Sequence, residues 1–360
     1  MELFQASKEW RSRPEDQRFL TLADLKASVD ARRKNSWTIS PRCSDLRVEN
    51  KEGDLGIMVF DPTVGEDRQL KPTNWSFNQL SQFAGAPASY LRNLHPQITA
   101  INLQYGLETV ARDKSALILG QSDSSSTEAI RAMTSTSYGR IYDSQVVDSV
   151  IKANQSGRWE IPASSYAATN PKRATTLYAS DRDVFIFLVD PKNPIEVGNE
   201  VLYRGFFAWN SEVGACTFGL ATFLYRHVCD NRIVWGATEV QELRIRHTSG
   251  APERFAYEGQ KFLTRYANES AGKLIEGIKK AKETPIPLGR QDTLDDWLKA
   301  RKFTQTEIKG IVETAKAEEG EARSVWDIIN GATAYARSIP NSNDRVDLET
   351  RASKLMSLVV

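Results

Sequence analysis

The chain has few of the residues that build disulfide scaffolds and metal centres. Its 360 residues include three histidines and three cysteines, Cys43, Cys216 and Cys229. Cysteines that are few, odd in number and widely spaced argue against a disulfide framework and favour a reducing compartment, so we expect a cytoplasmic protein. No hydrophobic run approaches the length of a membrane span, and the first residues, MELFQASKEW, lack the apolar core of a secretory signal.

An excess of charge of one sign is also missing. The sequence has 47 Lys and Arg against 46 Asp and Glu, which gives a formal net charge of +1. A role in nucleic-acid binding therefore needs a local basic patch, because the molecule as a whole is not a polycation. A chain of 360 residues is also long for one hydrophobic core, so we expect two or three domains.

The common catalytic signatures are absent from the sequence: it has no Walker A motif, Rossmann fingerprint or G-x-S-x-G. The histidines are too scattered for a local metal site, and no C-x-x-C is present. Cys229 follows His227 by two residues, but groups on one short segment rarely face each other as nucleophile and base, and a buried thiol is the plainer interpretation. We expect no metal, cofactor or catalytic residue, although distant segments can assemble a site that a sequence does not reveal.

Hydrophobic periodicity predicts an α+β fold, with a central antiparallel, curved sheet, covering helices and a C-terminal helical domain. Residues 184–189 are apolar at every position, which indicates a central strand covered on both faces. Strands at 175–180 and 201–210 and the segment ACTFGL extend this sheet, and GLATFLYRHV (219–228) is expected to be a helix. The expected domains are residues 1–130, 131–250 and 251–360.

Helical patterns lie on both sides of the central region. Residues 74–94 read as helix, Gly-Ala-Pro turn and helix, a spacing that resembles a helix-turn-helix; most such hairpins only pack, so DNA contact by this one stays open. The composition changes after residue 250, and residues 253–282 predict a long amphipathic helix. Thr304 and Glu307 have the spacing of a capping box. Further helices are expected at about 292–301, 304–317, 324–337 and 342–357.

The stretch from Leu202 to Gly236 combines aromatic and β-branched residues with arginines, which predicts a sheet that buries one face and offers the other to an anionic partner. In QELRIRH (241–247), Arg244 and Arg246 alternate with apolar residues, so their guanidiniums would stand roughly 7 Å apart along a strand and could meet phosphates. An interpretation as core aromatics with surface arginines stays equally open. The candidate nucleic-acid-binding residues are Arg131, Arg140, Tyr142, Arg204, Trp209, Arg226, Arg232, Arg244 and Arg246.

Six segments resemble a known family: FAGAPASYLRNL, INLQYGL, RAMTSTSYGRIYDSQVVDSV, TTLYASDRDVFIFLVD, RGFFAWNSEVGACTFGLATFLYRHVCDNRIVWGATEVQELRIRHTSGAP and VWDIINGATAYARSIP. They are similar to phage/plasmid-like proteins of a domain-of-unknown-function family (the 932 type), over about residues 70–350. The resemblance implies a mobile-element protein acting inside bacterial cells and carries over no catalytic residue. The expected strand and helix order at 175–229 is also similar, in topology only, to the β-β-β-α core of Rad52-like annealing proteins.

Two functions are therefore expected as alternatives. The first is a non-enzymatic phage- or plasmid-type DNA-binding protein, a single-strand annealing or recombination accessory, with single-stranded DNA as its partner and a homo-oligomeric state. The second is an oligomeric interaction or assembly protein without nucleic-acid binding, because arginine and aromatic residues are also enriched in protein interfaces.

Overall fold

The computed structural model describes most of the chain. It describes residues 13–355 except 52, 123–127, 163–168, 198–199, 229–230, 236–241, 269–271, 287, 289–292, 337, 340–347, 349–350 and 353. Only the backbone is described at residues 173, 197, 200, 224–228, 231–235, 242, 267–268, 273–274, 278 and 318–319.

An N-terminal unit is built on a six-stranded sheet with the order β2-β6-β7-β5-β4-β3. All of its described pairs are antiparallel except β5 with β7. Helices α3, α4 and α5 cover this sheet and enclose one apolar core with it. The strands are β2 (Ser36–Ile39), β3 (Arg47–Lys51), β4 (Asp54–Asp61), β5 (Glu66–Pro72), β6 (Ala116–Gln121) and β7 (Glu128–Ser135). The helices are α3 (Asn74–Phe83), α4 (Ala88–Leu91) and α5 (Pro96–Thr109).

The helical hairpin expected at 74–94 is confirmed as α3 and α4. Helix α3 begins after Thr73, whose side chain accepts a hydrogen bond from the Ser76 amide, as an N-cap residue should. Gly85, with φ of +69°, lets the chain turn after α3. Helix α4 has only four residues, so it is too short to act as a recognition helix in a DNA groove.

The central unit contains an eight-stranded sheet among the described residues, with the main order β1-β8-β9-β11-β12-β13. Every described pair is antiparallel, and β10 pairs with β11 while β14 pairs with β12. The strand predicted at 184–189 is β9, and all six of its side chains are buried. The strands are β1 (Arg18–Phe19), β8 (Leu177–Ala179), β9 (Val184–Val189), β10 (Ile195–Val197), β11 (Glu200–Asn210), β12 (Phe218–Val228), β13 (Asn231–Trp235) and β14 (Glu242–Ile245).

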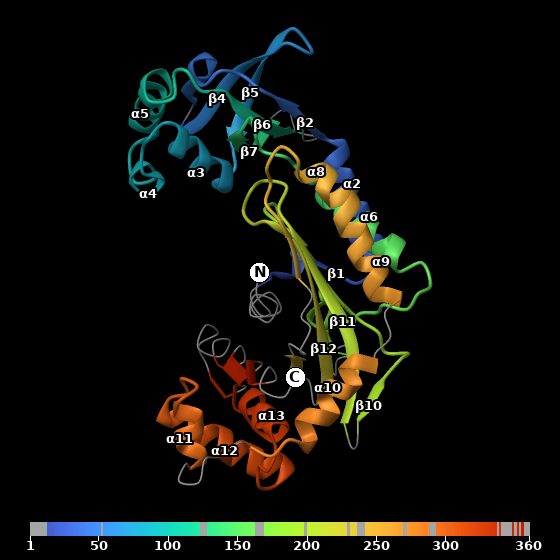
Figure 1. Ribbon diagram of the computed structural model, residues 1–360. Coiled ribbons are helices and arrows are strands. Elements are labelled where there is room, and N and C mark those ends of the chain that lie inside the picture. Colours follow the sequence, from blue (N-terminus) through green and yellow to red (C-terminus); the bar gives the residue numbers. More distant parts are fainter. Residues whose placement is uncertain are drawn as a thin grey trace.

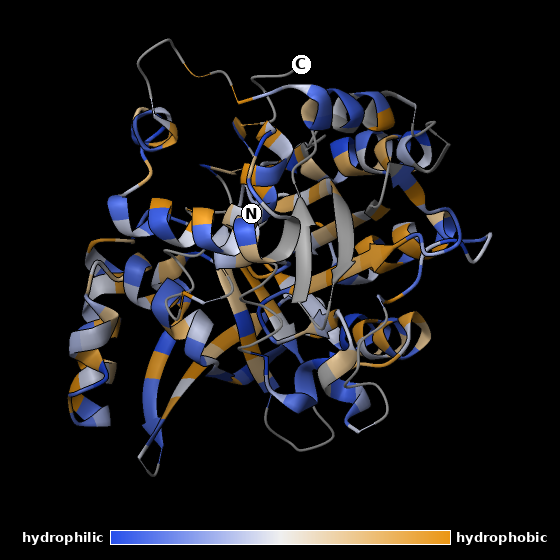
Figure 2. Cartoon of the chain, turned by 90° about the horizontal axis from the view of Figure 1, so that it is seen from below, coloured by the Kyte–Doolittle hydropathy of each residue, from blue (hydrophilic) through white to orange (hydrophobic). Residues whose placement is uncertain are grey.

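Helices cover one face of the central sheet (Figure 1). They are α2 (Leu22–Lys34), α6 (Asp143–Ala153) and the run α8 (Ala251–Arg254), π turn (Phe255–Gly259) and α9 (Gln260–Asn268). Side chains such as Phe206 and Phe218 fill the core between these helices and the sheet. Figure 2 shows the corresponding pattern, with hydrophobic residues concentrated on the strands and both kinds of residue on the helices.

Side chains on the opposite face of the central sheet are buried as well. This face carries an aromatic layer, made by Tyr178, Phe185, Phe187, Phe207, Trp209 and Phe223, and each of these residues is at most 3% exposed. The expectation that the sheet offers one open face to an anionic partner is therefore wrong for these strands. The physical reason is that β9 and β11 carry apolar side chains on both faces. Exposing either face to water would cost free energy, so both faces are buried.

The helix expected at 219–228 is also wrong, because this segment is β12. Leu220 packs on the helix-covered face, and Ala221 and Phe223 pack on the aromatic face. A strand that is apolar on both faces has no strict alternation, so its pattern also fits helical spacing. Strand β12 therefore takes the place of the helix in the expected β-β-β-α order, and the topological comparison with Rad52-like proteins loses the helix on which it depended.

The C-terminal region is helical, as predicted, and lies at the far end of the curved molecule from the N-terminal unit (Figure 1). Its apolar core includes Ile195 and Leu202, so the lower end of the central sheet packs against it. Thr304 and Glu307 form the expected capping box. The helices are α10 (Gly272–Glu283), α11 (Leu294–Lys299), α12 (Gln305–Glu319) and α13 (Val325–Ala336). The helix predicted at 342–357 falls mostly outside the described residues, and none of the described helices is both long and apolar enough to cross a membrane.

Sheet membership divides the first 135 residues between two units. Strand β1 pairs with β8 of the central sheet, and Leu25 and Val29 of α2 belong to the central core. Strand β7 continues past Arg131 inside the N-terminal sheet. The chain therefore passes between the two units more than once, and the proposed boundary at 130/131 stays a prediction.

Candidate functional site at the junction between the two sheets

The turn after β11 connects the central sheet to the N-terminal unit. Trp75 Nε1 and Gln79 Nε2, both on α3, donate hydrogen bonds to the Val213 carbonyl oxygen over 2.9 and 2.8 Å. The Val213 side chain is fully buried in a small cluster with Leu119 and Ala132 of the N-terminal sheet. Residues 210–214 thus insert from the central sheet into the N-terminal unit, and we call this turn the plug.

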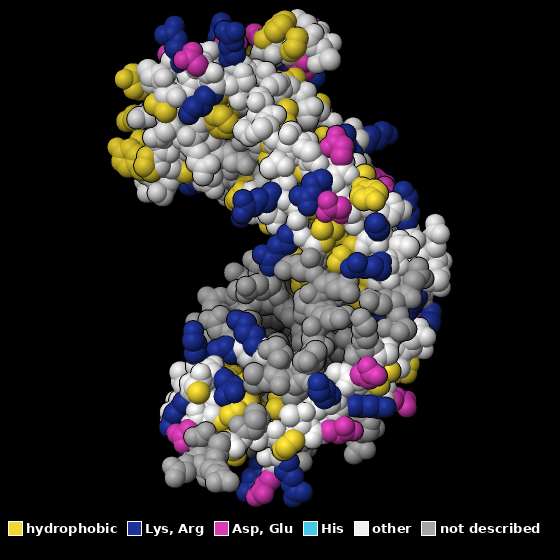
Figure 3. Space-filling view, viewed as in Figure 1, with side chains coloured by type: hydrophobic (Ala, Val, Ile, Leu, Met, Phe, Trp, Pro, Cys, Tyr) yellow, Lys and Arg dark blue, Asp and Glu magenta, His cyan; other side chains and the backbone are white. Residues whose placement is uncertain are grey.

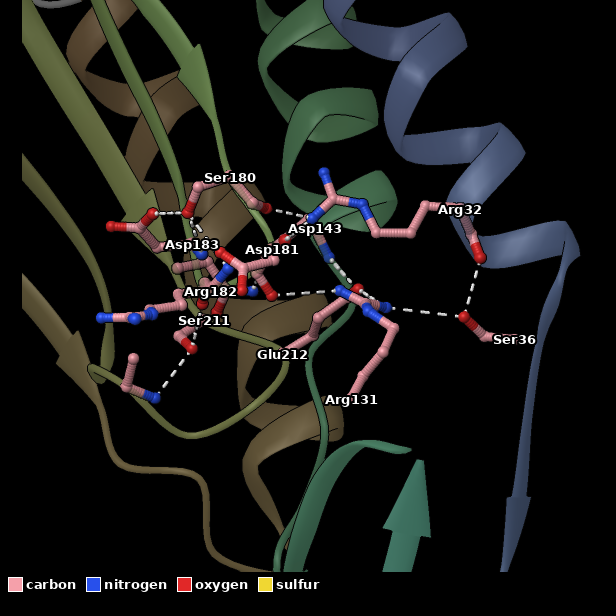
Figure 4. Close-up of polar contacts among 12 residues, drawn as sticks. Arg32, Ser36, Arg131, Asp143, Ser180, Asp181, Arg182, Asp183, Ser211 and Glu212 are labelled. Carbon is pink, nitrogen blue, oxygen red and sulfur yellow. Dashed lines mark hydrogen bonds and ion pairs between the residues drawn. The ribbon is translucent and has the colours of Figure 1, made fainter. Parts of the chain in front are cut away.

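Glu212, within the plug, forms a buried ion pair with Arg131 of β7. Arg131 Nη1 lies 2.5 Å from Glu212 Oε1, and the two residues are 4% and 2% exposed. The second carboxylate oxygen of Glu212 accepts a hydrogen bond from the Asp143 amide at the start of α6, over 3.1 Å. Figure 4 shows Arg131 between Glu212 and Ser36 of β2. The Glu212 carboxylate thus connects the plug with β7 of the N-terminal unit and with α6.

A second buried carboxylate, Asp143, completes the junction. Its Oδ1 accepts a hydrogen bond from Asn210 Nδ2 over 2.8 Å, and its Oδ2 lies 3.8 Å from Arg32 Nη1 of α2. Arg32 also donates to the Ser180 carbonyl oxygen. The Asp143 side chain is 1% exposed, so its charge depends almost wholly on these neighbours.

The two carboxylates have opposite pKa shifts. Burial, with the nearby charge of Glu212, raises the pKa of Asp143 well above its usual value. Burial also tends to raise the pKa of Glu212, but the positive charges of Arg131 and Arg32 outweigh it, so this pKa lies below its usual value. Glu212 is therefore the ionised partner of Arg131, and Asp143 takes up a proton much more readily.

A cleft of about 660 Å³ opens beside this cluster, between α2, β7 and the β8–β9 turn. Arg32, Arg131 and Ser180 line it, whereas Asp143 and Glu212 do not. The carboxylates therefore hold the arginines in place and have no direct access to a molecule in the cleft. Over the part of the chain that the structure describes, no group of three or more His, Cys, Asp or Glu residues could hold a metal ion.

Four of the predicted nucleic-acid-binding residues are interior groups, and the prediction that they share an open surface is wrong. Arg131 serves the junction, and Arg140, 7% exposed, donates to the Glu212 carbonyl oxygen. Arg204 shares a strand face with Phe206 and donates to the Tyr266 carbonyl oxygen of α9 over 2.5 Å. Trp209 is fully buried in the aromatic layer.

The other predicted residues have different positions. Tyr142 is half-buried, with the Arg33 guanidinium 3.4 Å from its ring centroid. Arg244 and Arg246 are exposed, and Ile245 between them is fully buried, which confirms the predicted alternation. The side chains of Arg226, Arg232 and His227, and the whole of Cys229, lie outside the described residues. Among the candidates whose side chains the structure describes, Arg244 and Arg246 are the two that lie exposed on its surface.

Sequence reasoning missed Glu212 and Asp143. A signal was present, because Glu212 is the only charged residue in the turn between the two longest strands of the region. A charge flanked by strands that are apolar on both faces favours a buried, paired position. Nothing in the local sequence points to Arg131 as the partner, since it lies 81 positions away in the chain.

Comparison with known proteins identifies the family but no relative of known function. Neither the curated proteins nor the solved structures contain a match to this chain. The family model described as Domain of unknown function (DUF932) matches residues 167–352, which include β8 to β14 and the helical domain. The chain therefore belongs to the DUF932 family.

Proposed function

We propose that this protein binds single-stranded DNA without catalysing a reaction on it, as an annealing or recombination accessory of phage or plasmid origin that works in the cytoplasm. The observation that carries the proposal is the exposed pair of Arg244, on β14, and Arg246, which directly follows β14, with Ile245 anchored between them. Contacts from guanidinium groups to phosphates would fix the strand without reading its bases.

The position of β14 suits an extended ligand. In the described residues β14 pairs with β12 alone, and Arg244 stands opposite Gly219. Two residues along a strand span roughly 7 Å, so both guanidiniums could meet phosphates of one extended strand. Figure 3 adds support, because Lys and Arg side chains lie on both sides of the hollow between the N-terminal unit and the helical domain.

The burial of Arg131, Arg140 and Arg204 makes this surface smaller than the sequence predicts. Few phosphate contacts imply modest affinity and a shallow salt dependence, since each contact to a single strand contributes a slope of about −0.7 in log K against log salt. The proposal therefore predicts binding that is clear at low ionic strength and weak at physiological ionic strength.

The test is a gel-shift and anisotropy titration with single- and double-stranded DNA at low salt. The double variant R244A/R246A should bind about tenfold more weakly and lose about 1.4 from the salt slope. Its melting temperature should stay near that of the wild type, because both side chains are exposed. The matched control is K279A/K280A, which removes two exposed cations from α10. A wild-type protein that binds no DNA at low salt rules the function out.

One observation favours an oligomeric assembly protein as the second candidate. On the outer face of α5, Ile98, Ile101 and Tyr105 are 48%, 59% and 68% exposed. Their spacings of three and four residues form an apolar seam of the kind that pairs with another helix. An antiparallel contact with α5 of a second copy would bring Ile98 against the partner helix near its Tyr105. An oligomer without DNA affinity would support this function over the first.

A further inference from the structure

The turn between β8 and β9 holds Arg182 at the end of the central sheet that faces the N-terminal unit. The Arg182 amide donates a hydrogen bond to Ser180 Oγ over 3.0 Å within the turn. The Arg182 carbonyl oxygen accepts one from Ser211 Oγ of the plug over 2.5 Å, and Figure 4 shows the turn beside Ser211. The backbone of Arg182 is therefore fixed both by its own turn and by the plug.

The Arg182 side chain is exposed and lies over an aromatic ring of the N-terminal unit. Its Cζ atom is 5.6 Å from the ring centroid of Trp75, the second residue of α3. The ring is itself anchored, because Trp75 Nε1 donates to the Val213 carbonyl oxygen. Within the part of the chain that the structure describes, no carboxylate or other acceptor binds the Arg182 guanidinium. Its N–H donors thus have a defined position and are available to a ligand.

The carboxylates at this end of the sheet do not neutralise Arg182. The turn carries Asp181 and Asp183, and the plug carries Glu212. Arg13 donates two hydrogen bonds to Asp183, over 2.7 and 2.6 Å, and Glu212 is paired within the junction. Asp181 lines the cleft beside α2, whereas Arg182 does not line it. Helix α3 has no charged residue, so the charge of Arg182 remains available to an anionic ligand.

Arg246 lies at the same end of the central sheet. Strand β9 begins next to the plug, after Arg182, and β14 ends next to it, before Arg246. One row of paired residues crosses the sheet from β9 to β14 and spans three strand spacings, about 14 Å. The row is made by Phe185, Trp209, Gly219 and Arg244.

The Arg246 side chain is exposed as well, and no described residue binds it. Ile245, next to it, packs in the helix-covered core, so strand alternation places Arg246 towards the opposite face. Arg182 also lies away from the covering helices, because it contacts α3 and does not line the cleft beside α2. The two guanidiniums therefore flank the plug, about 14 Å apart across the sheet.

We propose that this end of the central sheet binds the phosphodiester backbone of a single nucleic-acid strand, with Arg182 as a phosphate contact beyond Arg246. The inference rests on the proposed function and deepens it, because it gives the bound strand a course from β14 to the β8–β9 turn. Guanidinium groups bind phosphate oxygens through charge-assisted hydrogen bonds, often two at once. An extended single strand can reach both cations, since every one of its nucleotides carries a phosphate.

The test uses the full chain and a fluorescein-labelled oligothymidylate of about 20 nucleotides, which exceeds common site sizes. In anisotropy titrations over a range of low salt concentrations, R182A should bind about fivefold more weakly. It should also lose about 0.7 from the salt slope, and R182A/R246A about 1.4. R182K keeps the charge without the planar group, so it should keep the slope and regain only part of the affinity. Melting temperatures should stay near that of the wild type, because both side chains are exposed.

A matched control separates this site from a general effect of surface charge. R47A removes an exposed arginine from β3, the edge strand of the N-terminal sheet, and should bind like the wild type. If R182A binds as tightly as the wild type while R244A/R246A is weakened, this inference is overturned and the proposed function stands. Equal losses in R182A and R47A would also overturn it. If the wild type itself binds no oligothymidylate, the inference and the proposed function are both overturned.

Discussion

Arg131 and Glu212 are 81 residues apart in the chain, yet they form an ion pair over 2.5 Å with almost no exposed surface. Arg131 belongs to the N-terminal sheet and Glu212 to the plug of the central sheet. A buried charge without its partner is strongly unfavourable, so this pair makes the contact between the two units sensitive to either residue.

Substitution of Glu212 by Gln should destabilise the protein by about 3 kcal/mol or more, because it leaves the Arg131 guanidinium buried without a negative partner. Urea unfolding at neutral pH measures the change. The control is Glu313→Gln on α12, whose partner Lys309 lies 3.9 Å away and is 75% exposed. An exposed pair of this kind contributes at most about 1 kcal/mol. Equal losses in the two variants would contradict the importance of the buried pair.

Asp143 gives the junction a dependence on pH. An acid whose pKa is higher in the folded state holds more protons when folded than when unfolded, so its contribution to stability falls as pH rises from its usual pKa towards the raised one. Glu212, whose pKa is lowered, has the opposite effect: its stabilisation is present above its usual pKa and is lost as pH falls through the lowered value. The pH range in which Asp143 affects stability can therefore be distinguished from that of Glu212 by replacing Asp143 alone.

Asp143→Asn removes the titrating group and keeps an oxygen that can accept from Asn210. We expect this variant to gain stability relative to the wild type as the pH rises from about 4 to 7, since only the wild type must then hold an ionised carboxylate in this buried place. Urea unfolding at several pH values measures the difference. A difference that stays constant with pH, or that changes in the opposite direction, would contradict the raised pKa of Asp143.

Local patterns predicted the elements well where one signal dominated. The apolar run at 184–189 gave a central strand, and the alternation around Ile245 gave an outward Arg244 and Arg246. The capping box at Thr304 marked the start of α12. In each case the residues that decide the structure lie next to one another in the chain, so the sequence contains the information directly.

Predictions failed where the deciding partner is distant. The strand pattern alone predicts that Arg204 is a surface cation. In the structure its guanidinium donates a hydrogen bond to the carbonyl oxygen of Tyr266, 62 residues later, and its Cζ atom lies 4.2 Å from the Tyr266 ring centroid. The burial of Arg131 depends in the same way on Glu212. Strand alternation assigns a side chain to a face of the sheet, but it does not reveal whether a helix covers that face.

The aromatic layer makes a steric prediction at Gly219 of β12. A Cβ atom at this position would lie 1.9 Å from Trp209 Cζ2, and Trp209 is fully buried. Gly219→Ala should therefore cost about 1–3 kcal/mol through overpacking, as measured by thermal or urea unfolding. Gly56→Ala on β4 is the control, since the nearest atom to its Cβ is 3.6 Å away. Loss of similar size at both positions would show that the strand glycines matter for another reason.

The seam on α5 makes a prediction about self-association. Ile101 lies between Ile98 and Tyr105 on the exposed face, so Ile101→Asp would place a charge at the centre of a contact with a second copy. Light scattering after size exclusion should then shift from an oligomeric mass to that of a single chain, with the melting temperature of the separated protein nearly unchanged. Val64→Asp, in the exposed turn between β4 and β5, should leave the wild-type mass unaltered. An oligomer that survives Ile101→Asp would assign assembly to another surface, and a wild type already at single-chain mass would exclude the oligomer itself.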